Sequence, residues 1–253
     1  MKTRLLLLLL LAIGLAGIAR AVEAPPTKRV ALVFDDGPRP ADVEALLPIL
    51  AKENLHVTFS FVGDRVDESP AAAKAVAAAG HEVANHSQTH AHPKKLDDAA
   101  LDHEVGAAQE KIRAATGVAP RWYWPPYLES DDRLRGATAR AGLTLYPMQS
   151  VVVSMDYNLA VPAGEIFHRA TTDVKDGSVI LFHEWRKETR DELPAILAEL
   201  RRQGCVFLTF SALQDSLAQD KAKAKPVAAE PVKSTLLQKK PSWAGSAPAV
   251  ALL

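Results

Sequence analysis

The chain has 253 residues, and its 30 Lys and Arg are balanced by 30 Asp and Glu, so its formal net charge is zero. This length suits one mid-sized domain with its own hydrophobic core. The charge balance excludes the strong basic surplus typical of nucleic-acid-binding proteins, and we expect no nucleic-acid partner. The single cysteine, Cys205, excludes an intrachain disulfide and a multi-cysteine metal site.

The first 21 residues have the pattern of a secretory signal peptide. Lys2 and Arg4 precede an uncharged stretch from Leu5 to Ala19, and Ala19-Arg20-Ala21 supplies small residues around a cleavage site. The stretch is roughly fifteen residues, short of the about 20 needed to span a bilayer, although an uncleaved anchor stays open. We therefore expect a secreted or periplasmic protein without a stable membrane span after cleavage.

The remainder divides into one folded unit and a tail. Residues 25–215 are predicted to form a single domain, which shows no internal repeat. Residues 216–253 are low in complexity and rich in Ala, Lys, Pro and Ser. Such a composition buries too little apolar surface to offset the entropy lost on ordering, so we predict a disordered tail. We expect the protein to be a monomer.

Short apolar runs alternate with helical patterns along the predicted domain. The runs predicted as strands are Val30–Phe34, Val57–Val62, Glu82–Ala84, Trp122–Trp124, Leu143–Leu145, Val151–Val153, Val179–Phe182 and Val206–Phe210. The predicted helices are Val43–Lys52, Pro70–Ala79, Asp97–Thr116, Asp131–Ala141 and Asp191–Gln203. This alternation favours an α/β fold with a mainly parallel sheet closed into a barrel. The domain is too short for a complete eight-fold barrel, which takes about 250 residues.

Candidate functional residues follow directly after three of these strands, where barrels of this kind place their chemistry. Asp35 and Asp36 end the first run, and because successive side chains alternate, one can bind a cation while the other transfers a proton. Asp-Gly and Gly-Pro also make an ordinary turn, and that alternative stays open.

Two histidines follow the third run. His86 and His90 are four residues apart, so one helical turn would place both imidazoles on the same face. With Asp36 they complete a two-histidine, one-carboxylate set, which suits catalytic zinc or non-heme iron. A solvated histidine pair is the open alternative. His92 has no fitting spacing and is not assigned.

A further histidine, His183, ends the apolar run Val179–Phe182. Its ordinary pKa near 6.5 suits general acid or base catalysis. A core histidine that bonds a backbone carbonyl is the alternative.

Four segments together resemble the signatures of a known family. They are Val33–Pro38, Asn85–His90, Trp124–Tyr127 and Ile180–His183, in that order. The resemblance is to the polysaccharide deacetylases, the NodB-homology family of metal-dependent carbohydrate esterases (carbohydrate esterase family 4). It covers roughly residues 29–213 and implies a deformed, incomplete (β/α) barrel that removes acetyl groups from N-acetylated sugar polymers.

The resemblance also implies roles for particular residues. Asp36, His86 and His90 would hold a divalent metal, Zn²⁺ or in some members Co²⁺. Asp35 would be the general base and His183 the general acid. The backbone N–H of Tyr127 would help to bind the oxyanion, and Leu181 would line the pocket for the acetyl methyl group.

Two positions depart from the family pattern. Trp124 stands where the family has an Arg that pairs with the catalytic base, and Arg121 would compensate only if its loop bends back. The family's Asp-Trp pair is best matched by Asp156-Tyr157. We therefore expect Asp156 to orient His183 and Tyr157 to stand in for the Trp.

These expectations favour a hydrolase of linear amides that acts on an acetylated polysaccharide outside the cytoplasm, peptidoglycan-like or chitin-like. Two alternatives remain. One is an esterase for O-acetyl groups on a polysaccharide, and the other is a carbohydrate-binding protein whose site is impaired by Trp124. The sequence also leaves open whether four aromatic residues stack on sugar rings or pack in the core. They are Trp122, Tyr123, Trp124 and Trp185.

Overall fold

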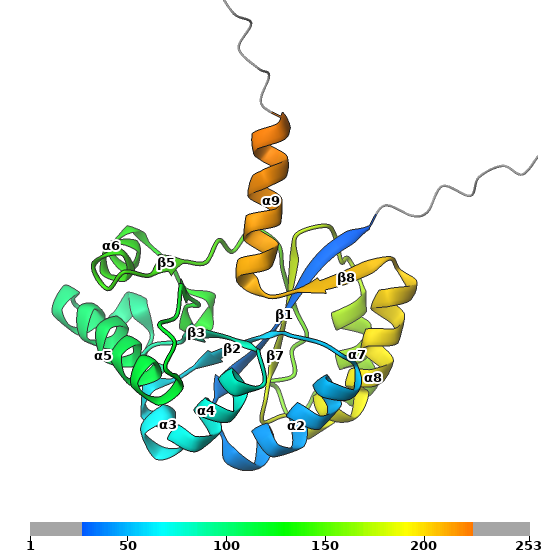
Figure 1. The fold of residues 1–253 in the computed structure, drawn as a ribbon, viewed down its shortest axis with the longest axis horizontal. Helices are drawn as coiled ribbons and strands as arrows, with labels where there is room; N and C mark the ends of the chain where they lie inside the picture. The colour runs from blue at the N-terminus through cyan, green and yellow to red at the C-terminus, as the bar shows by residue number, and fades with distance from the viewer. Residues whose placement is uncertain (1–26, 225–253) are drawn as a thin grey trace, which may run out of the picture.

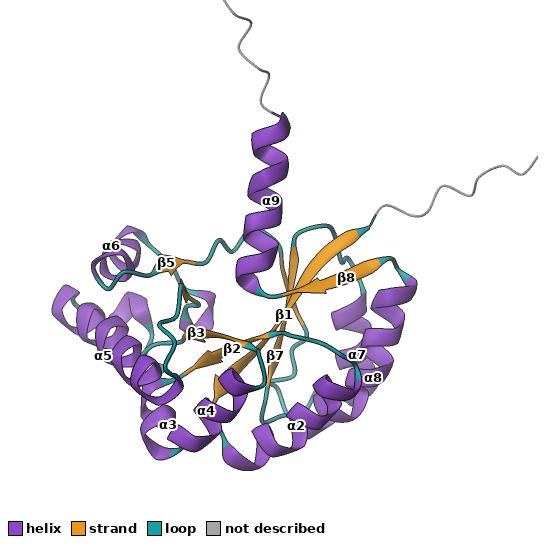
Figure 2. Cartoon of the chain, viewed as in Figure 1, coloured by secondary structure: helices purple, strands orange, loops and turns teal. Residues whose placement is uncertain are grey.

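Parallel strands form one curved, eight-stranded sheet in the computed structural model, which describes residues 27–224 (Figures 1 and 2). The strands are β1 (Lys28–Gly37), β2 (Thr58–Phe61), β3 (Glu82–Asn85), β4 (Trp122–Tyr123), β5 (Thr144–Leu145), β6 (Val151–Val153), β7 (Ser178–His183) and β8 (Cys205–Leu208). Their order is β5-β4-β3-β2-β1-β7-β6, with β8 paired to β1. Because β5 and β6 do not pair, the barrel is open there. The predicted incomplete (β/α) barrel is confirmed.

Helices cover the outer face of this sheet (Figure 1). They are α2 (Pro40–Lys52), α3 (Gly63–Glu68), α4 (Pro70–Ala78), α5 (Asp98–Thr116), α6 (Asp132–Arg140), α7 (Ala163–Thr171) and α8 (Lys187–Arg202). The chain also forms 3-10 turns η1 (Pro93–Lys95) and η2 (Pro126–Leu128) and the helix α9 (Phe210–Ala224), which does not cover this face. The side chains of Asp97 and Asp131 cap α5 and α6 by accepting backbone N–H groups in the first turn. Between residues 27 and 224, no helix combines the length and the apolar character that crossing a bilayer requires.

The alternation of side chains along β1 divides the interior into two cores. Val30, Leu32 and Phe34 face the helices, whereas Ala31 and Val33 face the inside of the barrel. Strand β7 follows the same rule in register with β1, since Asp35 pairs with His183. Each inward position near the carboxyl end of a strand therefore points into the open end of the barrel.

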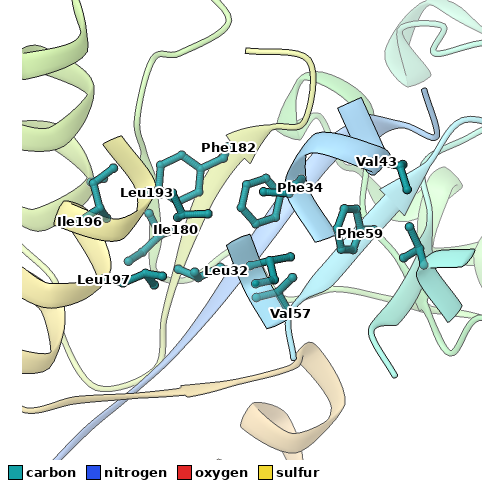
Figure 3. Packing of buried hydrophobic residues seen from close by; sticks show 14 of the residues in the cluster. Leu32, Phe34, Val43, Val57, Phe59, Ile180, Phe182, Leu193, Ile196 and Leu197 are labelled. Atoms are coloured by element: carbon teal, nitrogen blue, oxygen red, sulfur yellow. The ribbon is translucent and has the colours of Figure 1, made fainter. Parts of the chain in front are cut away.

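The outer core joins the sheet to the helices (Figure 3). Phe34 lies against both Phe59 and Phe182, with ring centroids 5.6 Å apart in each pair. Side chains from α8, among them Leu193 and Leu197, complete the cluster and are fully buried. This apolar layer fixes the central strands, and so it fixes the positions of the polar residues at their ends.

Aromatic side chains fill the inside of the barrel. Trp124, Tyr146 and Phe210 pack together, with the rings of Tyr146 and Phe210 stacked at 4.0 Å. Phe210 begins α9, the helix that projects from the body of the molecule in Figure 1. Arg29 at the start of β1 donates to Ser216 of this helix, at 2.8 Å, and pairs with Asp220. These contacts attach α9 to the start of β1.

The largest difference from the prediction concerns this C-terminal region. The strand predicted over Val206–Phe210 ends at Leu208, because Phe210 turns into the barrel and starts α9. The tail predicted from residue 216 begins inside that helix, which is ordered to Ala224. The short helices α3 and α7 were not predicted, since six and nine residues carry little periodicity. The predicted signal peptide and residues 225–253 lie outside the described residues.

Candidate active site

Inward positions at the strand ends assemble one cavity from segments far apart in the chain. Asp35 at the end of β1 and His183 at the end of β7 are neighbours in the sheet. Ser60 of β2, His86 after β3 and Trp124 after β4 continue the inward side of their strands. The site thus follows from the period-two alternation of a parallel sheet.

The two adjacent aspartates reach the same cavity because the strand changes course between them. Alternation alone would send Asp36 to the outer face. Instead, the register of β1 with β2 shifts between Phe34 and Gly37, and Asp36 adopts a left-handed backbone with φ 73°. Both carboxylates therefore line the cavity.

His86 and His90 are brought together by a loop, and the predicted helical turn is wrong. Ser87 and His90 both have positive φ, 70° and 63°, which no helix allows. The buried carboxylate of Glu104 in α5 accepts the backbone N–H groups of Gln88 and Thr89 at 3.0 and 2.9 Å. This pairing holds the loop closed, so the two imidazole centroids lie 4.9 Å apart.

Asp36, His86 and His90 fit a divalent metal ion. One ligand atom from each lies within 4.8 Å of the others. Asp36 Oδ1 is 3.2 Å from His90 Nε2 and 3.7 Å from His86 Nε2, and this oxygen is buried without a hydrogen-bond partner among the described residues. An unpaired buried carboxylate oxygen costs free energy that a cation would recover. The donor set is the one that catalytic zinc uses.

The protonation of His86 also suits a ligand. Its Nδ1–H donates to the Trp124 carbonyl at 2.7 Å, which leaves the lone pair of Nε2 facing Asp36. Burial lowers the pKa of His86 to about 3, so the ring is neutral at physiological pH. Burial lowers the pKa of His90 as well. Neutral imidazole is the form that binds a metal.

Asp35 is fully enclosed and held by neutral donors. The Trp124 indole Nε1–H donates to Oδ2 at 2.7 Å, and the Ser60 hydroxyl donates to Oδ1. Burial raises the pKa of Asp35 to about 7, while His183 and these hydrogen bonds oppose the rise. Arg121 does not compensate for the missing arginine, because it pairs with Asp215 at 2.9 Å. The Trp124 indole N–H thus supplies a hydrogen bond to Asp35 at the position where the resemblance expects an arginine.

His183 is oriented by a buried carboxylate. Asp156 Oδ1 accepts from His183 Nδ1 at 2.7 Å, and Oδ2 accepts from the His183 backbone N–H at 2.8 Å and from the Thr189 hydroxyl at 2.7 Å. Burial opposes a charge on His183, but the hydrogen bond and charge of Asp156 outweigh it and raise its pKa. The predicted contact between Asp156 and His183 is therefore present.

The cavity has a volume of about 580 Å³, and one side of it is apolar. Among the predicted residues, Leu181, Tyr127 and Tyr157 line it together with the aspartates and histidines. The ring of Tyr157 meets that of His183 edge-on, with centroids 5.9 Å apart. Tyr127 has positive φ, 57°, and its hydroxyl lies 3.2 Å from His90 Nδ1. The structure brings every predicted site residue to this cavity except Asp156, which lies behind His183.

Some contributors to the site were not assigned from the sequence. Trp185 follows His183 and its indole donates to Asp36 at 3.1 Å. His92 stacks flat on Tyr127, with centroids 3.6 Å apart. The sequence does carry a signal for Ser60, because Thr58 and Ser60 alternate with the apolar residues of the run Val57–Val62 and so share its inward side. Of the aromatic residues whose state was open, Trp122, Tyr123 and Trp124 are buried.

Comparisons with known proteins agree with this geometry. A family model described as polysaccharide deacetylase matches residues 23–146. The peptidoglycan-N-acetylglucosamine deacetylase PgdA of Listeria monocytogenes is 28% identical over 191 residues, which are 76% of this chain and 40% of that protein. The chain thus spans less than half the length of that curated relative.

Solved structures are similar over most of their length. A family 4 carbohydrate esterase from Streptomyces lividans, in complex with acetate, is 33% identical and has a TM-score of 0.66, with 71% of this chain and 91% of that chain covered. A variant of a Bacillus anthracis pseudoenzyme of this family, with restored enzymatic activity, is 25% identical and has a TM-score of 0.69, with 75% and 68% covered. From its motifs, its fold and these relatives, the chain belongs to the polysaccharide deacetylase family, carbohydrate esterase family 4.

Proposed function

We propose that this protein removes acetyl groups from N-acetylated sugars of a polysaccharide outside the cytoplasm. One observation carries the proposal: Asp35 and His183 line the same cavity as the ligand atoms of Asp36, His86 and His90. A base, an acid and a metal-ligating set in one cavity are the groups that amide hydrolysis requires. When bound, a Zn²⁺ or Co²⁺ ion lowers the pKa of water and polarises the acetyl carbonyl.

Asp35 acts as the general base in this proposal. It takes a proton from the water whose oxygen attacks the acetyl carbon. Trp124 and Ser60 each occupy one carboxylate oxygen and fix the orientation of the group. These donors are neutral, so they position the carboxylate without the charge of the family arginine. The backbone N–H of Tyr127 meets the charge that develops on the carbonyl oxygen.

His183 acts as the general acid. The C–N bond of the acetamide breaks, and an amine leaves badly as an anion, so it needs a proton at that moment. Asp156 raises the pKa of His183 and holds Nδ1, so Nε2 carries the proton that passes to the sugar nitrogen. Acetic acid, which ionises to acetate by releasing its proton to the solvent, and a free amino sugar are the products. Asp35 then carries one proton from water and His183 has given one away, so return of that proton from Asp35 to His183 through the solvent restores both groups.

The apolar side of the cavity accommodates the acetyl methyl group. Leu181, Val153 and Met155 line it, and Tyr157 closes it beside His183. The acetate bound to the Streptomyces lividans esterase supports a pocket of this kind in the family. Tyr157 is 48% exposed and Tyr127 is 52% exposed, so both rings are also open to a sugar.

The setting of the reaction is proposed from the sequence. The signal-peptide pattern of residues 1–21 supports a location in the periplasm or outside the cell, where peptidoglycan and chitin-like polymers are accessible. The peptidoglycan deacetylase among the relatives supports a cell-wall glycan as the substrate. Within the described residues, 27–224, the catalytic domain includes α9.

Acetate release tests the proposal. The full chain is incubated with Zn²⁺ or Co²⁺ and with chito-oligosaccharides, peptidoglycan or acetylated xylan, beside an Asp35→Asn control. We expect acetate from at least one N-acetylated substrate and a loss of about 10²-fold or more in the control. Release from xylan alone would instead establish an O-acetyl esterase. Stoichiometric metal binding without any acetate release would contradict the proposal and favour a carbohydrate-binding protein.

A further inference from the structure

Each carboxylate of the Asp35–Asp36 pair receives an indole N–H from a different part of the chain. Trp124, after β4, donates to Asp35 Oδ2 at 2.7 Å. Trp185, after β7, donates to Asp36 Oδ2 at 3.1 Å. The two contacts have the same chemistry, but the two carboxylates have different roles. Only Asp36 belongs to the metal-ligating set.

The Trp185 contact distinguishes the two oxygens of Asp36. Its N–H occupies Oδ2 and leaves Oδ1 buried without a hydrogen-bond partner among residues 27–224. Oδ1 is the oxygen that faces His86 and His90. A carboxylate can otherwise rotate to present either oxygen or both. The indole therefore selects one oxygen as the ligand and keeps it directed at the imidazoles.

Trp185 itself contacts two neighbouring side chains. Its ring lies 5.6 Å from that of His183, and the guanidinium of Arg39 lies 5.9 Å from the ring centroid. The preceding residue, Glu184, is buried and accepts the backbone N–H of Arg39. Arg190 donates to the carbonyl of Glu184. A donor fixed in this way loses little entropy when the metal binds.

A second group near Asp36 does not reproduce this effect. Arg65 donates to the backbone carbonyl of Asp36, and its Nη1 lies 3.9 Å from Oδ1. That distance exceeds a hydrogen bond. Arg65 thus fixes the backbone of the loop, whereas Trp185 fixes the carboxylate.

We propose that Trp185 is a positioning residue for the metal, which orients Asp36 through its indole N–H and so raises the affinity of the site for Zn²⁺. This inference rests on the proposed function, because it assumes that Asp36, His86 and His90 hold the ion. Groups that hydrogen-bond a metal ligand typically contribute 10–100-fold in metal affinity.

Two matched substitutions test the proposal in the full chain. Trp185→Phe and Trp122→Phe each remove one indole N–H bond, and the Trp122 bond goes to Ser211 at 2.9 Å, outside the cavity. Zn²⁺ dissociation constants are measured by competition with a chromophoric chelator, without substrate. We expect an increase of about tenfold or more for Trp185→Phe and a change below about twofold for Trp122→Phe.

Three results would overturn the proposal. The first is an affinity of Trp185→Phe within about twofold of the wild type, and the second is an equal loss in Trp122→Phe. The third comes from a substitution of the ring nitrogen alone. Incorporation of benzothienylalanine at position 185 keeps the ring size and replaces the N–H by sulfur. If Trp185→Phe weakens binding but this residue does not, packing rather than the hydrogen bond is responsible and the proposal is wrong.

The zinc affinities of these variants are interpreted separately from the acetate-release test of the proposed function. A wild-type protein that binds Zn²⁺ but releases no acetate contradicts the proposed function, while the affinities still decide the role of Trp185. A wild-type protein that binds no Zn²⁺ overturns both.

Discussion

At the scale of single residues, hydrogen bonds give chemically identical side chains of the site different roles. Asp35, Asp36 and Asp156 are chemically alike, yet each is held by different donors. Asp35 is enclosed by an indole and a hydroxyl, and burial raises its pKa to about 7. Asp156 accepts from His183 and Thr189, so its two oxygens are occupied. The surroundings of each carboxylate assign its task.

Asp156→Asn should lower turnover strongly with little change in metal affinity. The amide is neutral, so it no longer stabilises the protonated imidazole of His183, and it can orient the ring wrongly. A comparable substitution in a catalytic triad costs about 10⁴-fold, and we expect at least about 10²-fold here. Acetate release gives the rate, and zinc titration gives the affinity. Unchanged turnover would show that Asp156 does not act through His183.

At the scale of elements, the polar groups of the site come from the carboxyl ends of five strands, β1, β2, β3, β4 and β7, and the helices of the outer face pack against the sheet. This packing buries a titratable side chain, His81. It lies just before β3 and accepts the backbone N–H of Val57 at 3.3 Å, with its ring edge against Phe59. Burial lowers the pKa of His81 to about 4, and the nearby His56 contributes in the same direction.

His81 should therefore make the fold less stable in mild acid. In the unfolded chain the ring takes up a proton below its ordinary pKa of 6.5, but in the folded chain only below about 4. Stability is fully present above pH 6.5 and is lost as the pH falls toward 4, by of order 1 kcal/mol.

Urea unfolding of the wild type and of His81→Gln, at pH 7.5 and pH 4.5, measures this loss. The substitution should reduce the decrease in unfolding free energy between the two pH values, whatever it does at pH 7.5. Equal decreases in the two proteins would exclude His81 as the source.

At the scale of the whole molecule, the metal-ligating set connects segments that are distant in sequence. Asp36 lies near the carboxyl end of β1, and His86 and His90 follow β3. An ion held by all three binds the folded chain in preference to the unfolded one. Its binding free energy is then added to the stability of the barrel.

Zn²⁺ should raise the melting temperature of the full chain. At a free concentration 100 times the dissociation constant, the gain is about 2.7 kcal/mol, or about 5–10 °C for a domain of this size. Thermal unfolding with Zn²⁺ and with a chelator measures it. His86→Ala should abolish the difference, and an equal gain in that variant would place the ion elsewhere.

Much of the fold and most of the site could be predicted from local sequence. All eight strands were located, because their apolar runs are bounded by turns and helices. The residues of the site were found because they follow strand ends. Trp124 and Trp185 were not assigned as donors, since a hydrogen bond between residues 89 or 149 positions apart leaves no local signal. The path of His86 to His90 was predicted wrongly, because Glu104 holds the loop from another element.

The sequence by itself determined the α/β alternation, the incomplete barrel and the family, since these depend on periodicity and on short motifs. Only the tertiary structure decided that both aspartates share one cavity, because a strand irregularity and a left-handed residue override the alternation of side chains. It also decided that tryptophans orient these carboxylates and that α9 belongs to the fold. These features depend on contacts between side chains that are distant in sequence, and the packing of the whole core determines those contacts.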